Sequence, residues 1–300
     1  MSDIVLMDGG MGQELIARSS QPAHPLWSAH VMMHEPHIVE AVHRDYVEAG
    51  AKVIILNTYS ATPERLARDG SQAMFEPLQA KAIEIARRVA QAGAVRVAGC
   101  LPPLFGSYHP EDAPGFEACL ATYRRVVAQQ RDGVDLIACE TLSAVREVRA
   151  SVTAAAEAGV EVWCAMSVDD RDGTRLRSGE SVEEGAQVAR EAGAAAVAIN
   201  CSRPEAVGQA LPLLAGCGLP FGAWANGFED AQADLALGGT VDGMAVRTDL
   251  GPQAYGDQAM GWIEAGATIV GGCCEVGPAH IAHLADRLRA AGHEVTGRLS

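Results

Sequence analysis

The sequence is short of positive charge, of aromatic residues and of long apolar runs, and each shortage excludes a class of protein. The chain has 23 Lys and Arg residues against 38 Asp and Glu, a net charge of −15. Nucleic acid and anionic membrane surfaces repel so acidic a chain, and we expect neither as a partner. Aromatic residues make up 5% of the chain and hydrophobic residues 48%. We therefore expect a sizeable core built mainly from aliphatic side chains.

Targeting signals are also missing. The run Met1–Asp8 has no basic segment followed by a long apolar stretch, so we expect no signal peptide. No apolar run approaches the roughly 18 residues that a membrane-spanning helix needs. The eight cysteines are expected to be reduced thiols rather than a disulfide framework. These features predict a cytoplasmic protein, and they leave its oligomeric state open.

One phrase recurs along the chain: an amphipathic stretch, then a glycine, then a short apolar run. Glycine just past a helix end caps the helix in the left-handed conformation, and a short apolar run suits a buried parallel strand. We expect cap glycines at Gly50, Gly93, Gly133, Gly159, Gly193 and Gly266. The predicted strands are 4–7, 53–56, 95–97, 134–137, 160–163, 196–199, 220–224 and 267–270. Predicted helical stretches between them include 38–49, 78–92, 116–130, 144–158 and 182–192.

Eight strand–helix units predict an α/β fold, a (β/α)8 TIM barrel in which residues 1–300 form a single domain. The alternative is an open, doubly wound sheet. A barrel places the active site at the C-terminal ends of its strands. Polar or reactive side chains follow every predicted strand: Asp8, Asn57 with Thr58, Cys100, Glu140 with Thr141, Ser167, Asn200 with Cys201, Asn226, and Cys273 with Cys274.

Three of these residues predict a metal site. Cys201 ends the sixth predicted strand, and Cys273 and Cys274 end the eighth, directly after two flexible glycines. In a closed barrel one strand separates the two, so their upper ends can converge on one atom. Three thiolates with an open fourth position form a zinc site of the catalytic kind. The alternative is three buried reduced thiols, and Cys100 is the nearby candidate for a fourth protein ligand that would close the site.

Such a site suits the methylation of a thiol. A free thiol has a pKa of about 8.5 and is a poor nucleophile near neutral pH, whereas binding to Zn²⁺ removes its proton. A zinc ion rich in cysteine ligands leaves the bound thiolate nucleophilic enough to attack a methyl group activated as a sulfonium or ammonium. A hydrolytic zinc would more typically use His and carboxylate ligands. We expect no catalytic residue beyond the thiolate that zinc activates.

An amino-acid thiol also needs partners for its ammonium and carboxylate groups. Glu140 is the first candidate for the ammonium and Asp8 the second. Gly9 and Gly10 would let backbone N–H groups approach a ligand, and a helix from Gln13 onward would favour a carboxylate at its N-terminus. The strand-end residues complete the predicted substrate-binding set: Asn57, Thr58, Ser167, Asn200 and Asn226.

The long segment 100–110 is a predicted lid over this mouth. Phe105, Tyr108 and Trp224 are candidate walls for a cationic methyl donor, because aromatic faces attract cations. Ordinary loop packing is the alternative.

Over almost its whole length the chain resembles the homocysteine S-methyltransferases. The resemblance rests on residues 8–12, 26–29, 57–64, 140–141, 176–181, 200–201, 225–226 and the run Gly-Gly-Cys-Cys at 271–274. It implies a zinc barrel in which Cys201, Cys273 and Cys274 bind the metal and the sulfur of homocysteine completes the site. Asp8, Glu140 and Asn226 would orient the amino acid.

The resemblance further implies a methyltransferase of EC class 2.1.1 that forms methionine from homocysteine and S-methylmethionine or S-adenosylmethionine. No residues remain for a folate or cobalamin domain, so the methyl group is expected to come directly from a small molecule. Alternatives are betaine as donor, selenocysteine or another thiol as acceptor, and a non-catalytic barrel that binds zinc or thiols. Family members usually follow the paired cysteines with Gly or Arg and then Thr, whereas this chain has Glu275 and Val276. An acid there would disfavour an anionic donor.

Overall fold

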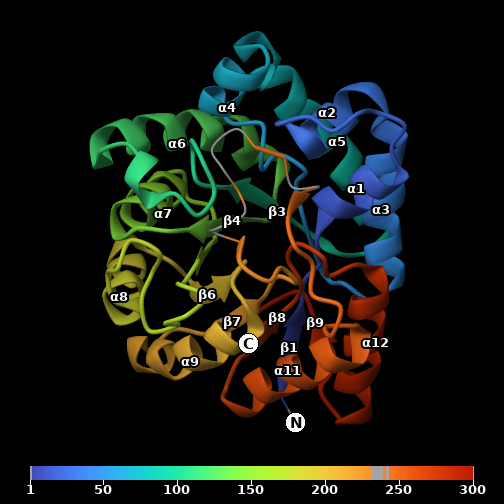
Figure 1. Cartoon of the computed structure of the whole chain (residues 1–300), viewed down its shortest axis with the longest axis vertical. Helices are drawn as coiled ribbons and strands as arrows, with labels where there is room; N and C mark the ends of the chain where they lie inside the picture. The colour runs from blue at the N-terminus through green and yellow to red at the C-terminus, as the bar shows by residue number, and fades with distance from the viewer. Residues whose placement is uncertain (1, 232–234, 236–238, 241–242, 300) are drawn as a thin grey trace.

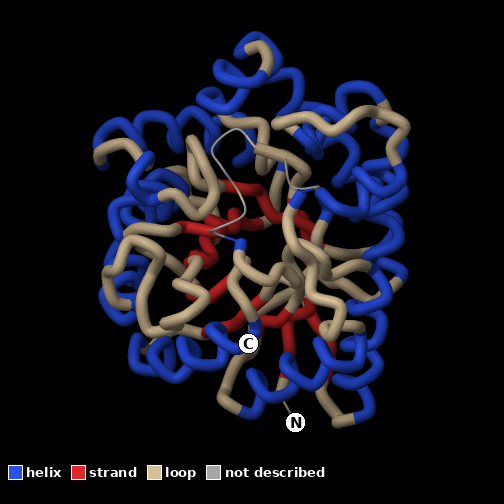
Figure 2. Tube along the Cα trace, in the orientation of Figure 1, coloured by secondary structure: helices blue, strands red, loops and turns tan. Residues whose placement is uncertain are grey.

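A ring of parallel strands forms the centre of the molecule, and the helices lie outside it (Figure 1). The structure is a computed structural model that describes residues 2–231, 235, 239–240 and 243–299. Figure 2 shows the strands in red enclosed by the helices in blue. The strands are β1 (Asp3–Leu6), β2 (Val53–Ile55), β3 (Arg96–Leu101), β4 (Leu136–Leu142), β5 (Val162–Met166), β6 (Ala196–Asn200), β7 (Phe221–Trp224), β8 (Ile269–Val270) and β9 (Glu294–Thr296). The predicted (β/α)8 barrel is confirmed, with a ninth strand that was not predicted.

Contacts between the first two strands close the ring. The sheet order is β2-β3-β4-β5-β6-β7-β8-β1-β9, and all neighbouring strands are parallel. Met7 bridges to Val53, and the Asp8 N–H donates to the Val53 carbonyl at 3.0 Å, so the upper end of β1 also lies beside β2. Strand β9 pairs with the lower part of β1. Because the barrel is closed, the C-terminal ends of the eight strands surround one mouth.

The helices follow the predicted alternation with the strands. They are α1 (Met11–Arg18), α2 (Trp27–His34), α3 (Pro36–Glu48), α4 (Pro63–Asp69), α5 (Phe75–Gly93), α6 (Phe116–Gln130), α7 (Val145–Glu157), α8 (Val182–Ala192), α9 (Pro204–Leu214), α11 (Pro252–Glu264) and α12 (Pro278–Ala290). The predicted stretches 116–130 and 182–192 match α6 and α8 at both ends, and the other three differ by at most three residues at either end. In the described part of the chain, no helix has the length and hydropathy to cross a membrane.

Four of the six predicted cap glycines have the expected backbone conformation. Gly50, Gly159, Gly193 and Gly266 have φ between 71° and 112°. The prediction is wrong for two others: Gly93 is the last residue of α5, where Ala94 takes the left-handed conformation, and Gly133 lies in a 3₁₀ turn, Arg131–Gly133. Both positions need glycine for space instead. A Cβ would come within 2.5 Å of the Val47 side chain at Gly93, and of the Ile83 side chain at Gly133.

Strands β3 and β4 extend well beyond the predicted 95–97 and 134–137. Their hydrogen-bonded ladder continues through the pair Cys100 and Ala138 and the pair Leu101 and Cys139. Small residues interrupt the apolar run in the sequence, but they do not interrupt backbone pairing. As a result, Cys100 and Glu140 lie inside strands rather than after them. The remaining predicted strands differ from the observed ones by at most three residues at either end.

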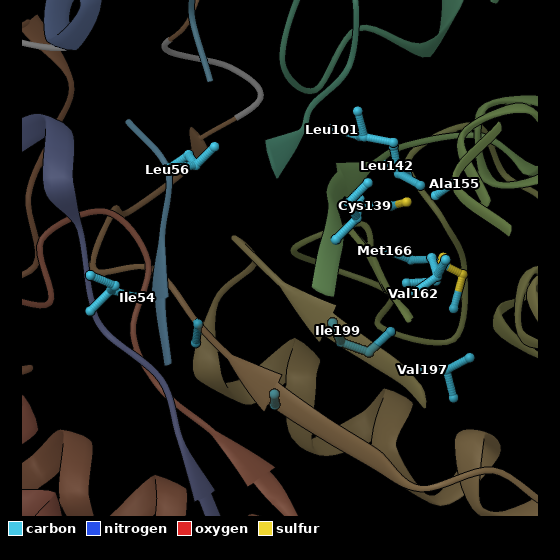
Figure 3. Close-up of a cluster of buried hydrophobic side chains, with 14 of the residues drawn as sticks. Ile54, Leu56, Leu101, Cys139, Leu142, Ala155, Val162, Met166, Val197 and Ile199 are labelled. Atoms are coloured by element: carbon cyan, nitrogen blue, oxygen red, sulfur yellow. The ribbon is translucent and has the colours of Figure 1, made fainter. Parts of the chain in front are cut away.

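Two apolar layers hold the barrel together. Strand side chains alternate between the barrel interior and the layer under the helices, as Val53 and Ile54 do on β2. The outer layer is drawn in Figure 3, where Leu101, Leu142 and Ile199 of the strands are labelled together with Ala155 of α7. The interior contains many alanines, and the buried rings of Trp163 and Trp224 fill it. Two tryptophans at the centre explain how a chain with few aromatic residues packs a full core.

The cap-glycine interpretation can be tested with a pair of substitutions of opposite sign. Gly159 has φ +71° and Gly208 lies within α9, both are exposed, and a Cβ at either position would meet nothing within 4 Å. We expect Gly159→Ala to lower the free energy of unfolding by about 1 kcal/mol, because an L-residue is strained there. Gly208→Ala should raise it by up to about 1 kcal/mol. Denaturant unfolding measures both, and equal effects would contradict the assignment.

Candidate active site

Three cysteine sulfurs meet at the mouth of the barrel. Cys201 follows β6, and Cys273 and Cys274 follow β8. Their Sγ atoms all lie within 4.8 Å of one another, and the Sγ atoms of Cys201 and Cys274 are 3.8 Å apart. Two sulfurs bound to one tetrahedral zinc ion at about 2.3 Å would be about 3.8 Å apart. The donor set and its spacing therefore fit a three-thiolate metal site with one position left for a ligand.

Unusual backbone conformations bring these sulfurs together. Cys201 has φ +46° and Glu275, directly after the paired cysteines, has φ +65°. Residues other than glycine are strained in this region, and such strain concentrates at functional sites. Gly271 and Gly272 were predicted to supply backbone freedom for this turn, but neither has a positive φ. Both are needed for close packing, because a Cβ would come within 2.7 Å of Met7 or within 2.2 Å of Val276.

Gly9 and Gly10 make room for the same turn. A Cβ on Gly9 would lie 2.1 Å from the Val276 carbonyl oxygen, and one on Gly10 would lie 2.5 Å from the Cys273 carbonyl oxygen. Tyr255 holds the turn from α11, its hydroxyl donating to the Gly271 carbonyl at 2.6 Å. The glycine run after β1 thus supports the turn that carries Cys273 and Cys274 as well as lining the cavity beside it.

Of the three thiols, only that of Cys201 has a lowered pKa. Burial alone would raise the pKa of Cys201, but hydrogen bonds from Cys273, Cys274 and Tyr108 bring it well below its usual range. Their hydrogen bonds with Cys201, together with burial, raise the pKa values of Cys273 and Cys274. Protein groups alone therefore stabilise one thiolate in this cluster. Removing the protons from all three sulfurs requires a cation among them.

Two buried carboxyl groups lie beside the cysteines. Burial raises the pKa of Asp8 well above its usual value, and the neighbouring charge of Glu140 adds to that shift. Burial likewise raises the pKa of Glu140 to about 7. One oxygen of Asp8 accepts the Ile55 N–H at 2.9 Å, which fixes the carboxyl at the mouth. A positive group between these carboxyls would favour ionisation of both, as the ammonium of an amino acid would.

Aromatic and apolar side chains line the cavity above the cysteines. Asp8, Gly9, Gly10, Asn57 and Glu140 line it as predicted, together with the three cysteines and Tyr108. The first turn of α1, from Met11 to Gln13, also lines it, so the helix begins two residues before the predicted Gln13. Ser107 lines it from the predicted lid segment 100–110, and further lining residues were not predicted: Trp27, Tyr59, Phe228, Leu235 and Met244. Of these, Trp27 and Tyr59 lie inside segments that carry the family resemblance, the one available signal in the sequence.

Several predicted residues lie behind the cavity. Thr58, Ser167, Asn200 and Asn226 are buried but do not line it, and Phe105 and Trp224 are not among its walls either. Asn200 accepts the Thr141 N–H at 2.7 Å and so supports β4. Ser167 donates to the Cys201 carbonyl at 3.3 Å. The Nδ2 of Asn226 is buried without a partner among the described residues.

Cys100 does not join the cluster of three cysteines. Its thiol donates to Oε1 of Glu140 at 2.9 Å, and the close group of sulfurs contains Cys201, Cys273 and Cys274 alone. Among the residues that the structure describes, no fourth cysteine closes the site. Cys100 instead stabilises the charged form of Glu140, and so lowers the pKa of that carboxyl against the effect of burial.

Comparison with known proteins links this site to one family. A family model described as homocysteine S-methyltransferase matches residues 5–288. The homocysteine S-methyltransferase of Escherichia coli is 34% identical, and the match covers 95% of each chain. A selenocysteine methyltransferase of Astragalus bisulcatus is 29% identical over 90% of this chain and 88% of the relative. The crystal structure of the homocysteine methyltransferase MmuM from Escherichia coli in its metallated form has a TM-score of 0.79 at 31% identity, covering 95% of this chain and 96% of that one. The family match includes both segments that carry the clustered cysteines.

The contact between Cys100 and Glu140 makes a measurable prediction for the metal-free protein. Infrared difference spectra against pH should show a carboxyl group that is protonated below about 7 and ionised above it, and Glu140→Gln should remove that band. Cys100→Ala should move the midpoint upward, because the carboxylate loses its thiol donor. Cys100→Ser keeps a donor and should keep the midpoint near that of the original protein. A midpoint that Cys100→Ala leaves unchanged would contradict this assignment.

Proposed function

Because the chain belongs to the homocysteine S-methyltransferase family and is a methyltransferase, we propose that it methylates homocysteine, held at a zinc ion as a thiolate, to form methionine. The proposed donor is S-methylmethionine or S-adenosylmethionine. The observation that carries this proposal is the cluster of three sulfurs at the floor of a cavity walled by aromatic rings and two buried carboxyls.

Cys201, Cys273 and Cys274 would hold the zinc ion. Sulfur ligands select soft or borderline metals over magnesium or calcium, and the spacing of the sulfurs suits zinc. A bound zinc ion would remove the proton from the thiol of homocysteine at neutral pH, and the sulfur would remain nucleophilic. The metallated form of the Escherichia coli relative supports a metal in this family of barrels. With one position open, the site is of the catalytic rather than the structural kind.

The remaining groups of homocysteine would bind between β1, β4 and α1. Asp8 and Glu140 accept its ammonium group, which also compensates for the burial of two carboxyls. The first turn of α1 lines the cavity and no side chain caps it, so this helix N-terminus suits the carboxylate. Asn57 lines the same wall, while Thr58, Ser167, Asn200 and Asn226 support it from behind. Together these contacts fix the direction in which the sulfur points.

A cationic donor suits the charge of this mouth. Three cysteine thiolates and a substrate thiolate outweigh a divalent cation, and Glu275 adds a half-buried carboxyl beside them. The rings of Trp27, Tyr59, Tyr108 and Phe228 line the cavity, and aromatic rings attract a cation such as a sulfonium. The homocysteine sulfur forms a bond to the methyl carbon as the bond from that carbon to the sulfonium breaks. The leaving group departs as a neutral thioether, so no general acid is needed.

The acceptor side chain is the second part of the proposal. A relative named selenocysteine methyltransferase covers most of this chain at 29% identity, so selenocysteine is the alternative acceptor to homocysteine. Residues 1–300 would act as one homocysteine-binding barrel domain. The site needs reduced thiols, and none of the eight cysteines forms a disulfide bond. This supports a location in the cytoplasm, where thiols stay reduced.

One pair of cysteine variants tests the role of the cluster. Cys273→Ala should lose both the bound zinc and the transfer of a labelled methyl group from S-methylmethionine to homocysteine, because the donor set falls to two sulfurs. Cys217→Ala is the matched control, since this buried cysteine lies in the turn after α9, away from the cluster, and it should keep both. Zinc content is read by mass spectrometry of the metal and methionine by its isotopic mass. Activity that persists in metal-free Cys273→Ala protein would end this mechanism.

A further inference from the structure

Cys201 makes hydrogen bonds through both its sulfur and its carbonyl oxygen. Its Sγ lies 3.1 Å from the hydroxyl oxygen of Tyr108. Its carbonyl accepts from Ser167 Oγ at 3.3 Å and from Arg177 Nη2 at 3.4 Å. The residue is buried and has φ +46°, a conformation that a cysteine does not adopt without support from its surroundings. The contacts with these three residues supply that support.

Tyr108 is itself fixed. It is buried, has φ +67°, and lies in the segment between β3 and α6. The guanidinium carbon of Arg177 lies 4.6 Å from the centre of its ring. Arg177 is held in turn by Nε, which donates to Ser167 Oγ at 2.7 Å, and by an ion pair with Asp170 at 3.1 Å. Tyr108 and Cys201 therefore belong to one buried network that joins the segments after β3, β5 and β6.

The hydrogen bond from Tyr108 changes the chemistry of the sulfur that accepts it. A thiolate that accepts an O–H donor has part of its negative charge taken up, so it is a weaker nucleophile than a bare thiolate. The three ligand sulfurs lie within 4.8 Å of one another, next to the position of the substrate sulfur. An activated methyl group that reaches one thiolate therefore comes close to the others. The site must favour the substrate sulfur over its own ligands.

We propose that Tyr108 is a positioning residue that holds Cys201 in place as a metal ligand and shields its sulfur from methylation by the donor. The inference rests on the proposed function, because it needs both the bound zinc and an activated methyl group. Without the shield, Cys201 Sγ would form a bond to the methyl carbon while the carbon–sulfur bond of the sulfonium breaks. The electron pair would leave with the neutral thioether, and Cys201 would become S-methylcysteine. That product is uncharged and binds zinc poorly.

Tyr108→Phe removes the hydroxyl and keeps the ring under Arg177. Tyr123→Phe is the matched control, because the buried hydroxyl of Tyr123 donates to the Pro102 carbonyl at 3.0 Å, at the base of the same segment. Zinc affinity is measured without substrates, by competition with a coloured chelator. We expect about a tenfold or larger loss of affinity for Tyr108→Phe, in the range seen when partners of metal ligands are removed, and none for the control.

Two further readouts separate a role at the sulfur from a general structural role. In cobalt-loaded protein, the sulfur-to-cobalt charge-transfer band should shift for Tyr108→Phe and stay in place for Tyr123→Phe. Zinc-loaded proteins are then incubated with S-methylmethionine in the absence of homocysteine, and the peptide that contains Cys201 is analysed by mass spectrometry. We expect an added methyl group on Cys201 in Tyr108→Phe, well above the level in the original protein and in the control.

The possible results are distinct. If the original protein binds no zinc, the proposed metal site fails and this inference fails with it. If the original protein binds zinc and Tyr108→Phe matches it in affinity, cobalt spectrum and Cys201 methylation, this inference alone is overturned. Arg177→Leu is a second, independent variant, because it keeps the hydroxyl but removes the cation that packs on the ring. It should change the three readouts in the same direction, and an unchanged Arg177→Leu protein would contradict the role of the network.

Discussion

The rest of the site depends on holding three cysteine sulfurs close together in a buried place. Three thiolates repel one another, and the surrounding protein lowers the pKa of one of them only, Cys201. A cation is what allows all three to be ionised together, and it is also what would ionise an incoming thiol. The same arrangement therefore fits both the proposed metal and the proposed activation of a substrate sulfur.

The backbone conformation of the segments after β1, β6 and β8 brings the three sulfurs together. Cys201 and Glu275 take strained conformations, and Gly10 leaves the space through which the Cys273–Cys274 turn passes. Tyr255 and Arg177 then hold backbone carbonyls on either side of the cluster. These supports come from the segments after β1 and β5 and from α11, so several elements of the barrel together hold the sulfurs in place. The fold thus supplies the geometry that no single segment could keep by itself.

Strand periodicity and strand-end chemistry were enough to predict the barrel and the convergence of three cysteines at its mouth. Cysteines after the sixth and eighth strands must converge once the ring closes, and the sulfurs of Cys201 and Cys274 do so. What could not be predicted depends on contacts between distant loops. Trp27 and Tyr59 reach the cavity through the packing of α2 and the segment after β2, and Tyr108 reaches Cys201 from the segment after β3. The length of β4 was also missed, because small residues such as Ala138 pair in a ladder as well as large ones do.

The most direct test of this account is a competition between methyl donors. Zinc-loaded protein and homocysteine are mixed with S-methylmethionine, S-adenosylmethionine and betaine, each carrying a methyl group of different isotopic mass. The isotopic mass of the methionine formed is then measured by mass spectrometry. The account predicts methionine with one dominant label, taken from a sulfonium donor. Methionine labelled by betaine would contradict the proposed donor. Zinc-loaded protein that forms no methionine would contradict the proposed reaction itself.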